Sequence, residues 1–271
     1  MFKKTALVAG LGLALSSAAQ ADYRWEAGVD LSGGDVDAIG VGGTFYLSPV
    51  DDTKGPLGEA AFLDHASSIS ANYIDGETDG DGEGIEFKDY SISGRYVTNE
   101  ARWIFDLGYE RNEPDNPFGV GPDEFEIDTF TAGIGKYLTD STTLVFTYQN
   151  KDADEGGDVD TYRADIEHLW QLSKVALKFN AGYGQTDIEE EFGDDIDIWD
   201  AGVTVYPSKR LGIGGGYRNT ENDLAEIEQY FARAEWFINE QVGISLEYQD
   251  AELDDTDIEA DAVVFGARLR F

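Results

Sequence analysis

The sequence predicts an all-β protein, a transmembrane antiparallel up-and-down β-barrel of about fourteen strands, with about 12 to 16 strands compatible with the pattern. Three observations carry this prediction: period-two alternation of apolar residues, a leader at the amino terminus, and a last strand that ends on an aromatic residue. We expect residues 1–21 to be a cleaved signal peptide and residues 22–271 to form a single outer-membrane β-barrel domain.

The leader has the parts of a secretory signal. Lys3 and Lys4 form the basic region, Ala6 to Leu15 the apolar core, and Ala19-Gln20-Ala21 the cleavage site before Asp22. The apolar core, about ten residues, is well short of the ~20 residues of a membrane-spanning helix. The sequence contains no cysteine, which excludes a lipid anchor and suits an exported chain.

The last ten residues alternate strictly. One face is apolar and the other small or basic, as in Val263, Phe265, Ala267, Leu269 and Phe271 against Gly266, Arg268 and Arg270. An outer-membrane barrel needs such a strand, because its last strand pairs with its first and leaves no free edge.

Hairpins of the same kind precede it. The first runs from Tyr23 to Leu31, turns at Ser32–Asp35, and returns to about Leu47. Later segments repeat the alternation: Ile69–Tyr73, Tyr90–Tyr96, Trp103–Tyr109, Leu144–Tyr148, Tyr162–Trp170, Val175–Tyr183, Leu211–Tyr217, Tyr230–Trp236 and Val242–Tyr248. In Thr129–Leu138 and Trp199–Tyr206, the tyrosines Tyr137 and Tyr206 break the parity of the other apolar residues, which a β-bulge at an unknown position would explain.

The connections alternate between two kinds. Short turns lie at Val97–Ala101, Thr139–Thr142, Gln171–Lys174, Pro207–Arg210 and Asn239–Gln241. Longer acidic loops lie at Asp75–Gly84, Glu113–Glu124, Lys151–Asp158, Asp187–Asp195, Thr220–Glu228 and Asp250–Glu259. Because a chain with a signal peptide starts in the periplasm, strand parity places the short turns in the periplasm and the acidic loops outside the cell.

Large aromatic residues cluster near the predicted strand ends. We expect an aromatic girdle with Trp25, Tyr96, Trp103, Trp170, Trp236 and Phe271 at the periplasmic boundary and Tyr73, Tyr109, Tyr148, Tyr183, Tyr217 and Tyr248 at the outer one. The alternative is cross-strand aromatic pairing in a water-soluble sheet.

The stretch from Ser48 to Ala66 lacks this alternation. Tyr46-Leu47-Ser48-Pro49-Val50-Asp51 and Gly55-Pro56-Leu57-Gly58-Glu59-Ala60-Ala61-Phe62-Leu63 resemble a segment that follows the second strand in Gram-negative outer-membrane porins of the general bacterial porin family. The resemblance implies a diffusion channel that the β-barrel assembly machinery inserts. No loop is long enough to fold deeply into the lumen as the constriction loop of large trimeric porins does. Pro56–Ala66 is either a short helix covering the periplasmic mouth or an ordered turn.

Strand parity also names the residues expected to line the lumen. These are Arg24, Glu26, Arg95, Arg102, Asp106, Arg163, Asp165, Glu167, Lys178, Arg233, Glu235, Glu247, Arg268 and Arg270. Such charges either set ion selectivity or pair across strands to satisfy a polar interior. The inward glycines Gly182, Gly212, Gly214 and Gly216 indicate either an open interior or close packing.

The formal charge of −36 makes nucleic acid an improbable partner. A negative mouth attracts cations, which predicts a weak cation preference. The acids alternatively serve solubility or salt adaptation, or bind divalent ions that bridge lipopolysaccharide. Asp75, Glu77, Asp79, Gly80 and Glu86 have nearly the spacing of a calcium loop, but strand-like flanks and a general excess of acids make this a weak candidate.

The sequence does not favour an enzyme. Its two histidines are His65 and His168, and His168 shares the apolar face with Trp170. We expect a porin, a passive water-filled channel for ions and small hydrophilic solutes, without a cofactor. The alternative is a non-conducting structural or adhesion barrel whose acidic loops bind cations, lipopolysaccharide or a partner. Expected partners are outer-membrane lipid, lipopolysaccharide and small solutes, and the sequence leaves open whether the chain forms a homo-oligomer.

Overall fold

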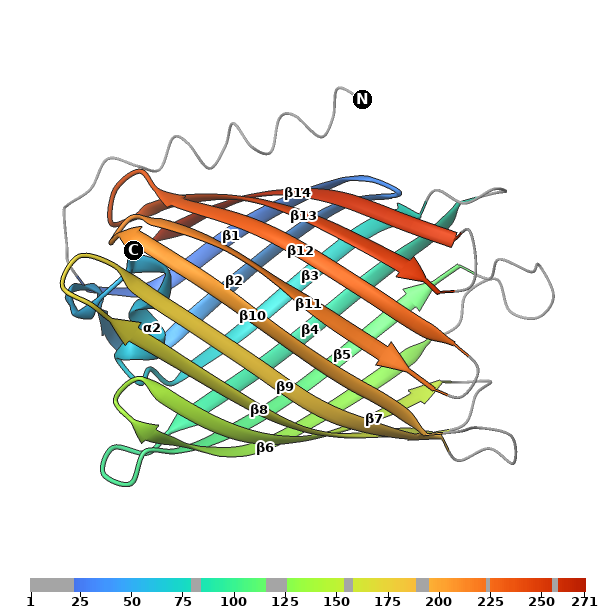
Figure 1. The fold of residues 1–271 in the computed structure, drawn as a ribbon, viewed down its shortest axis with the longest axis horizontal. Coiled ribbons are helices and arrows are strands. Elements are labelled where there is room, and N and C mark those ends of the chain that lie inside the picture. Colours follow the sequence, from blue (N-terminus) through green and yellow to red (C-terminus); the bar gives the residue numbers. More distant parts are fainter. Residues whose placement is uncertain are drawn as a thin grey trace.

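The protein is a single closed β-barrel (Figure 1). The computed structural model describes residues 22–78, 84–115, 126–153, 158–188, 195–222, 225–254 and 258–271. The signal peptide expected at residues 1–21 and the tips of the acidic loops lie outside these ranges.

Fourteen antiparallel strands form the wall. They are β1 (Asp22–Gly34), β2 (Val36–Asp51), β3 (Ser68–Thr78), β4 (Ile85–Val97), β5 (Trp103–Pro114), β6 (Ile127–Thr139), β7 (Thr142–Ala153), β8 (Val159–Gln171), β9 (Ala176–Ile188), β10 (Ile196–Ser208), β11 (Leu211–Glu221), β12 (Glu226–Phe237), β13 (Val242–Leu253) and β14 (Ile258–Arg270).

Each strand pairs with its neighbours in sequence, and β14 pairs with β1 from Glu26↔Arg270 to Gly34↔Ala262. No strand edge is left unpaired in the ring, which satisfies the backbone hydrogen bonds within the wall. The predicted fold class is therefore confirmed.

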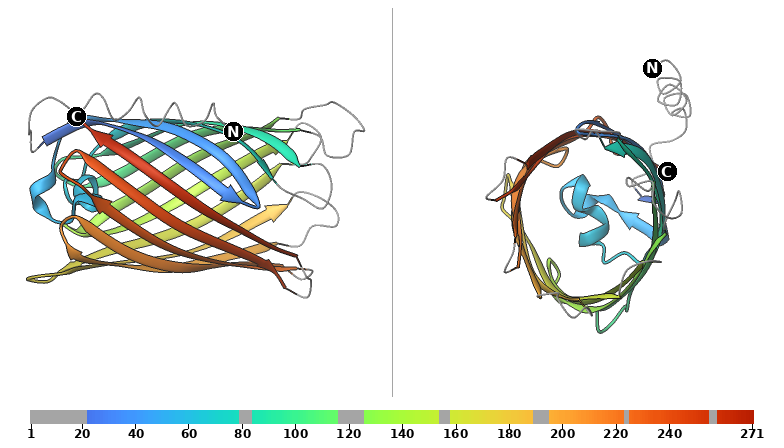
Figure 2. Two further views of the ribbon diagram at one scale, coloured as in Figure 1. Left: turned by 90° about the horizontal axis from the view of Figure 1, so that it is seen from above. Right: turned by 90° about the vertical axis from the view of Figure 1, so that its right-hand side faces the viewer.

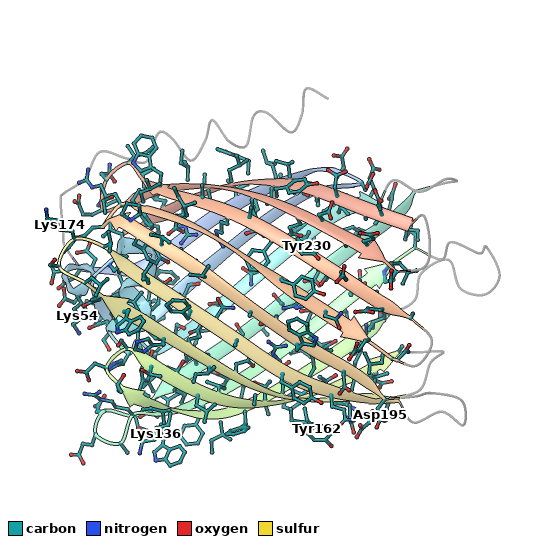
Figure 3. The ribbon with its side chains drawn as sticks, viewed as in Figure 1. Lys54, Lys136, Tyr162, Lys174, Asp195 and Tyr230 are labelled. Atoms are coloured by element: carbon teal, nitrogen blue, oxygen red, sulfur yellow. The ribbon has the colours of Figure 1, made fainter. Side chains whose placement is uncertain are left out.

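The short turns and the described flanks of the acidic loops lie at opposite ends of the barrel. The part of the chain that the structure describes begins and ends at the short-turn end, where Lys54 and Lys174 also lie, whereas Asp195 lies at the acidic-loop end (Figure 3). Between these ends the outer face is apolar: Leu107 on β5 is 61% exposed and Ile92 on β4 is 53% exposed. Exposed apolar side chains of this extent suit a surface that contacts lipid.

The two strands with uncertain parity alternate regularly up to a register shift at one end of each. Tyr137 on β6 and Tyr206 on β10 are buried, and both contact a segment inside the barrel. The register shifts lie at the short-turn ends of these strands, between Tyr137 and Thr139 and between Val205 and Ser208. The apparent break in parity arose because these tyrosines face inward rather than toward lipid.

Residues 52–66 form a compact segment between β2 and β3, which we call the plug segment. It contains two 3-10 turns, η1 (Asp52–Lys54) and η2 (Leu57–Glu59), and the short helix α2 (Ala60–Leu63). An end-on view shows α2 inside the ring of strands (Figure 2). Of the expected alternatives, a short helix at the mouth is observed. No helix in the described part of the chain is long and apolar enough to cross a membrane.

The buried apolar residues gather around this segment. One cluster joins Ala60 to Tyr23, Tyr46 and Val50, and a second joins Leu63 to Leu169, Ala176 and Tyr206. Phe62 packs against this second cluster and against a third formed by Val97, Ile104, Tyr137 and Val145. The apolar core of the protein therefore lies at the short-turn end and holds the plug segment against strands on several sides.

Candidate channel lumen

Charged residues of the lumen face pair with one another both along a strand and from one strand to another. Arg163 on β8 donates from Nε to Asp165 Oδ1 at 2.7 Å, and its Nη2 also pairs with Asp200 on β10. The guanidinium reaches Asp200 across β9 at Gly182, where a Cβ atom would lie 1.9 Å from Arg163 Nη2. This glycine therefore provides clearance for an ion pair, which is the close-packing alternative rather than an open interior.

Side chains also fill the space beside other inward glycines. A Cβ atom at Gly212 would lie 2.7 Å from the Tyr206 ring, and one at Gly216 would lie 2.5 Å from the Phe231 ring. A Cβ atom at Gly214 would lie 2.4 Å from Thr204 Oγ1. The neighbouring side chains thus fill the space over these glycines.

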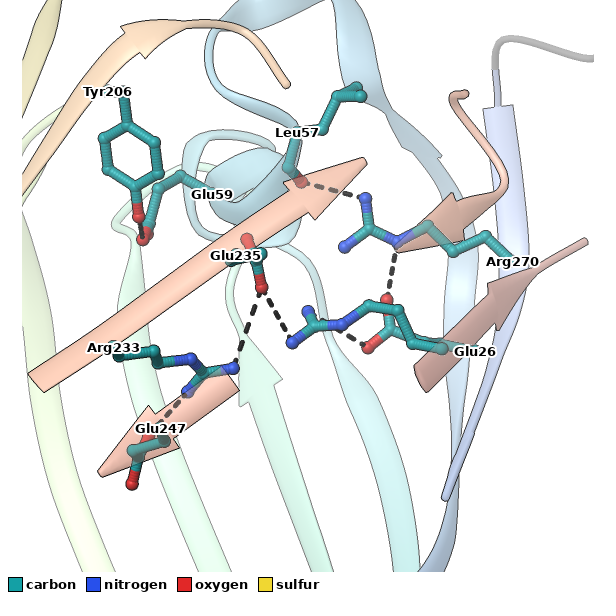
Figure 4. Close-up of polar contacts among 9 residues, drawn as sticks. Glu26, Leu57, Glu59, Tyr206, Arg233, Glu235, Glu247 and Arg270 are labelled. Atoms are coloured by element: carbon teal, nitrogen blue, oxygen red, sulfur yellow. Dashed lines mark hydrogen bonds and ion pairs between the residues drawn. The ribbon is translucent and has the colours of Figure 1, made fainter. Parts of the chain in front are cut away.

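A continuous chain of charges runs along β12, β13, β14 and β1 (Figure 4). Arg233 lies 3.7 Å from both Glu235 and Glu247, and Arg268 Nη2 lies 2.8 Å from Glu235 Oε2 and its Nη1 3.9 Å from Glu26 Oε1. Each cation contacts two carboxylates or more than one acceptor group. This arrangement lowers the cost of placing charge on the inner wall.

Arg270 ends this chain at the plug segment. Its Nε donates to Glu26 Oε2 at 2.6 Å and its Nη1 to the Leu57 carbonyl at 2.8 Å. The guanidinium lies 4.6 Å from the Tyr23 ring centroid and 4.5 Å from that of Phe237. Only 3% of the residue is exposed. A fully desolvated arginine with these partners fixes the plug segment to the last strand.

The opposite side of the lumen has fewer charges. Arg95 on β4 and Asp106 on β5 form a bidentate pair with two contacts of 2.8 Å. Hydroxyl groups surround them, with Thr44 Oγ1 2.9 Å from Ser70 Oγ and Asn72 Nδ2 3.2 Å from Ser91 Oγ.

The described residues line several cavities in the interior. One of about 740 Å³ is lined by β9–β14 and by Gly58 and Glu59 of the plug segment. A second of about 630 Å³ lies against β2–β6 and touches Ala61 and Phe62, and a third of about 460 Å³ lies against β1–β4. The two larger cavities are lined by many charged and hydroxyl groups, so this part of the lumen is a polar space able to hold water, whereas the lining of the third has more apolar residues.

The plug segment bonds to strands far from it in sequence. Glu59 accepts hydrogen bonds from Tyr206 Oη and, at 3.1 Å, from Lys178 Nζ. Tyr137 Oη donates to the Phe62 carbonyl at 2.9 Å, and Gln171 Nε2 donates to the Lys54 carbonyl at 2.8 Å. Lys209 Nζ donates to the Thr53 carbonyl, which also bonds the plug segment to the β10–β11 turn. The plug segment therefore narrows the barrel at the short-turn end, where Pro56–Ala66 was expected as a short helix or an ordered turn.

Two carboxyl groups at the short-turn end have shifted pKa values. The hydrogen bond from Arg102 holds the pKa of the Asp140 carboxyl below its usual range. Burial raises the pKa of the Asp52 carboxyl in η1.

Two residues expected in the lumen lie elsewhere. Arg102 precedes β5, has a left-handed backbone with a φ of 55°, and pairs with Asp140 in the neighbouring turn. The expected lumen position of Arg102 extended the alternation of β5 to the residue before Trp103, where the strand begins. Arg24 is exposed and sits at the register shift between Tyr23 and Trp25, and it is Tyr23 that faces inward.

The other expected lumen residues are brought together by the pairs above. Glu167 lies beside Lys178, with Oε1 3.3 Å from Nζ. Three residues missed by the sequence analysis are Glu59, Tyr137 and Tyr206. The one available signal was Glu59 itself, a lone acid within the apolar stretch Leu57–Leu63.

The expected girdle residues occupy the strand ends of the outer face. Those at the short-turn end are all exposed, namely Trp25, Tyr96, Trp103, Trp170, Trp236 and Phe271. At the other end Tyr109, Tyr183 and Tyr248 are exposed, whereas Tyr73, Tyr148 and Tyr217 are half-buried in cross-strand aromatic pairs. Their hydroxyl groups bond carboxylates above them, as in Tyr109–Asp128, Tyr148–Asp160, Tyr183–Asp197, Tyr217–Glu228 and Tyr248–Asp250.

The weak calcium candidate receives no support. Asp75 pairs in register with Lys88, and Glu77 with Glu86, on the adjacent strands β3 and β4. Asp79 lies outside the described residues. Among the residues that the structure describes, no group of three or more histidine, cysteine or acidic side chains is placed to hold a metal.

Comparison with known proteins agrees with this geometry. Residues 3–271 match the family model described as "Putative general bacterial porin". No curated protein matches the sequence.

Solved structures share the barrel. The Acinetobacter baumannii outer membrane protein Omp33 aligns with a TM-score of 0.65 and 19% identity over 93% of this chain and 99% of that chain. The Pseudomonas putida toluene transporter TodX aligns with a TM-score of 0.55 and 9% identity over 93% of this chain and 89% of that one. These identities show a shared fold. The family match covers nearly the whole chain, and the protein therefore belongs to the general bacterial porin family, as an outer-membrane β-barrel of a Gram-negative bacterium.

Proposed function

We propose that the protein is a passive, water-filled channel for ions and small hydrophilic solutes, with a weak preference for cations. The observation that carries this proposal is the polar lumen, in which three cavities of about 740, 630 and 460 Å³ lie within a closed barrel. Charged groups along such a path favour hydrated solutes over apolar ones.

The weakness of the cation preference follows from the pairing of the lumen charges. Arg163, Arg268 and Arg270 each contact at least one carboxylate, so much of the interior field cancels. The chain nevertheless carries a formal charge of −36, and acids predominate at the acidic-loop end. A negative mouth raises the local cation concentration without excluding anions.

One observation favours the second candidate, a non-conducting structural or adhesion barrel: the plug segment is bonded to β6, β8, β9, β10 and β14 at one mouth. In that case the acidic loops would bind cations, lipopolysaccharide or a partner. Under either function we propose lipopolysaccharide as the neighbouring outer-leaflet lipid and the β-barrel assembly machinery as the agent of insertion. Homo-oligomerisation is compatible with both functions.

We propose no catalytic role. His65 Nε2 lies 3.1 Å from the Asp140 carbonyl oxygen, and His168 Nδ1 lies 2.8 Å from Thr142 Oγ1 beside Trp170. Both rings have structural partners.

Purified protein in planar lipid bilayers tests the proposal. We expect stepwise single-channel currents and a reversal potential of cation-preferring sign in a KCl gradient. A sample purified identically from cells that lack the protein is the control. Anion selectivity would contradict the cation preference, and absence of steps from folded protein would favour the non-conducting barrel.

A further inference from the structure

Lys178 extends from the barrel wall to the plug segment. It lies on β9, and its Nζ is 3.1 Å from Glu59 Oε2 on the plug segment and 3.3 Å from Glu167 Oε1 on β8. The ammonium also lies 5.6 Å from the ring centroid of Phe62. The side chain therefore spans the space between the wall and the plug segment.

The two larger cavities meet at this side chain. Lys178 lines the 740 Å³ cavity together with Gly58 and Glu59, and it lines the 630 Å³ cavity together with Ala61 and Phe62. The plug segment lies between these cavities, and the ammonium occupies the gap between that segment and the wall. Among the described residues, this amine lies between these two cavities.

We propose that Lys178 is a selectivity residue of the channel, a bar whose ammonium group limits both the width of the passage beside the plug segment and the entry of cations into it. The inference rests on the proposed channel function. Beside the plug segment, Glu59 and Glu167 neutralise the ammonium of Lys178. This neutralisation suits a channel with a weak preference for cations.

Loss of the ammonium changes the site in a definite way. Glu59 keeps its hydrogen bond from Tyr206, so its carboxylate stays at the passage when Lys178 loses its charge. Two carboxylates would then face a wider passage without a cation beside them. Rings of acidic side chains select cations in channels.

The test compares Lys178→Gln with the matched control Lys136→Gln. Lys136 lies on the outer face with its Nζ 5.3 Å from the Trp103 ring centroid. Lys136→Gln therefore removes one positive charge, as Lys178→Gln does, but outside the lumen. We expect Lys178→Gln to raise single-channel conductance and to increase the potassium-to-chloride permeability ratio about fivefold, the effect of one charge at about 4 Å in water. Lys136→Gln and Lys178→Arg should keep the wild-type ratio.

A double variant covers the case in which an unpaired Glu59 loosens the plug segment. Glu59→Gln/Lys178→Gln removes the unpaired carboxylate from the plug segment and leaves Glu167 on the wall, and it should raise conductance with a smaller change in ratio than Lys178→Gln. Heat-modifiable migration on gels confirms that each barrel is folded.

The outcomes separate the two proposals. If wild type conducts, and both Lys178→Gln and the double variant match Lys136→Gln in conductance and ratio, the role of Lys178 is overturned while the channel function stands. If the folded wild type passes no current, the channel function itself fails, and the wild-type recording alone reveals it.

Discussion

The two sides of the lumen hold their polar groups in different ways. On β8–β14 and β1, which we call the charged wall, arginines and carboxylates form networks that cross several strands, such as Arg163–Asp165–Asp200. On β2–β6, the hydroxyl wall, serine and threonine side chains bond the neighbouring strand, as Thr44 does with Ser70. The hydroxyl wall also has one bidentate pair, Arg95–Asp106, and a carboxyl pair, Asp89–Glu110.

The difference shows what each wall requires of its sequence. A short hydroxyl group needs a partner directly across the strand pair and nothing further. A long charged side chain needs partners on two strands and a small residue over which it can pass, as Arg163 passes over Gly182. Stability of the charged wall should therefore depend on more residues, and single substitutions there should cost more.

The largest contrast is expected between Arg270→Met and Arg95→Met. Arg270 is buried, and its loss leaves Glu26 and the Leu57 carbonyl without their closest donor, so we expect a loss of about 3–5 kcal/mol in the free energy of unfolding. The side chain of Arg95 is 40% exposed, so Arg95→Met should lower the free energy of unfolding by about 1 kcal/mol. Urea titration in lipid vesicles, followed by tryptophan fluorescence, measures both. Equal losses would show that the two walls do not differ in this respect.

A second comparison uses glycines. Gly182→Ala displaces the Arg163 guanidinium and leaves Asp200 with Arg218 at 3.6 Å, which should cost about 1–3 kcal/mol. Gly108→Ala in the hydroxyl wall places its Cβ in ordinary contact with Thr131, 3.4 Å away, and serves as the control. The same titration applies. A Gly182→Ala barrel as stable as Gly108→Ala would mean that the Arg163–Asp200 pair contributes little.

The smallest effect is expected for Ser70→Ala. This substitution removes one hydroxyl bond to Thr44 in a lumen that holds water, so the free energy of unfolding should fall by about 1 kcal/mol or less. The double variant Thr44→Val/Ser70→Ala, compared with each single variant, measures the coupling between the two groups. A coupling as large as the cost of Arg270→Met would contradict the local character of the hydroxyl wall.

Much of the barrel was predictable because period-two alternation is a local property. The apolar face from Val263 to Phe271 and the hairpin that begins at Tyr23 are read directly from the sequence. The orientation of Tyr137 and Tyr206 stayed ambiguous because tyrosine suits both a lipid boundary and a buried site with a hydroxyl partner. Their orientation depends on the plug segment, which no pattern in their own strands reveals.

The plug segment itself was only partly predictable. Its helix-compatible residues indicate a short helix, but its position inside the lumen depends on Tyr137, Lys178 and Arg270, which are distant in sequence. Glu59 is one of 55 acidic residues, and its position within the apolar stretch Leu57–Leu63 does not show which strands it contacts. Arg102 was assigned to the lumen because alternation alone does not show where a strand begins.

The distance in sequence between the plug segment and its partners determines the order of assembly. Leu57 bonds Arg270, 213 residues later, and Glu59 bonds Tyr206, 147 residues later. Contacts between such remote residues form only after the intervening chain is in place. Docking of residues 52–66 is therefore completed only when Arg270 on β14 is in place, whereas the bonds of this segment to β6, β8, β9 and β10 do not depend on closure of the seam between β14 and β1.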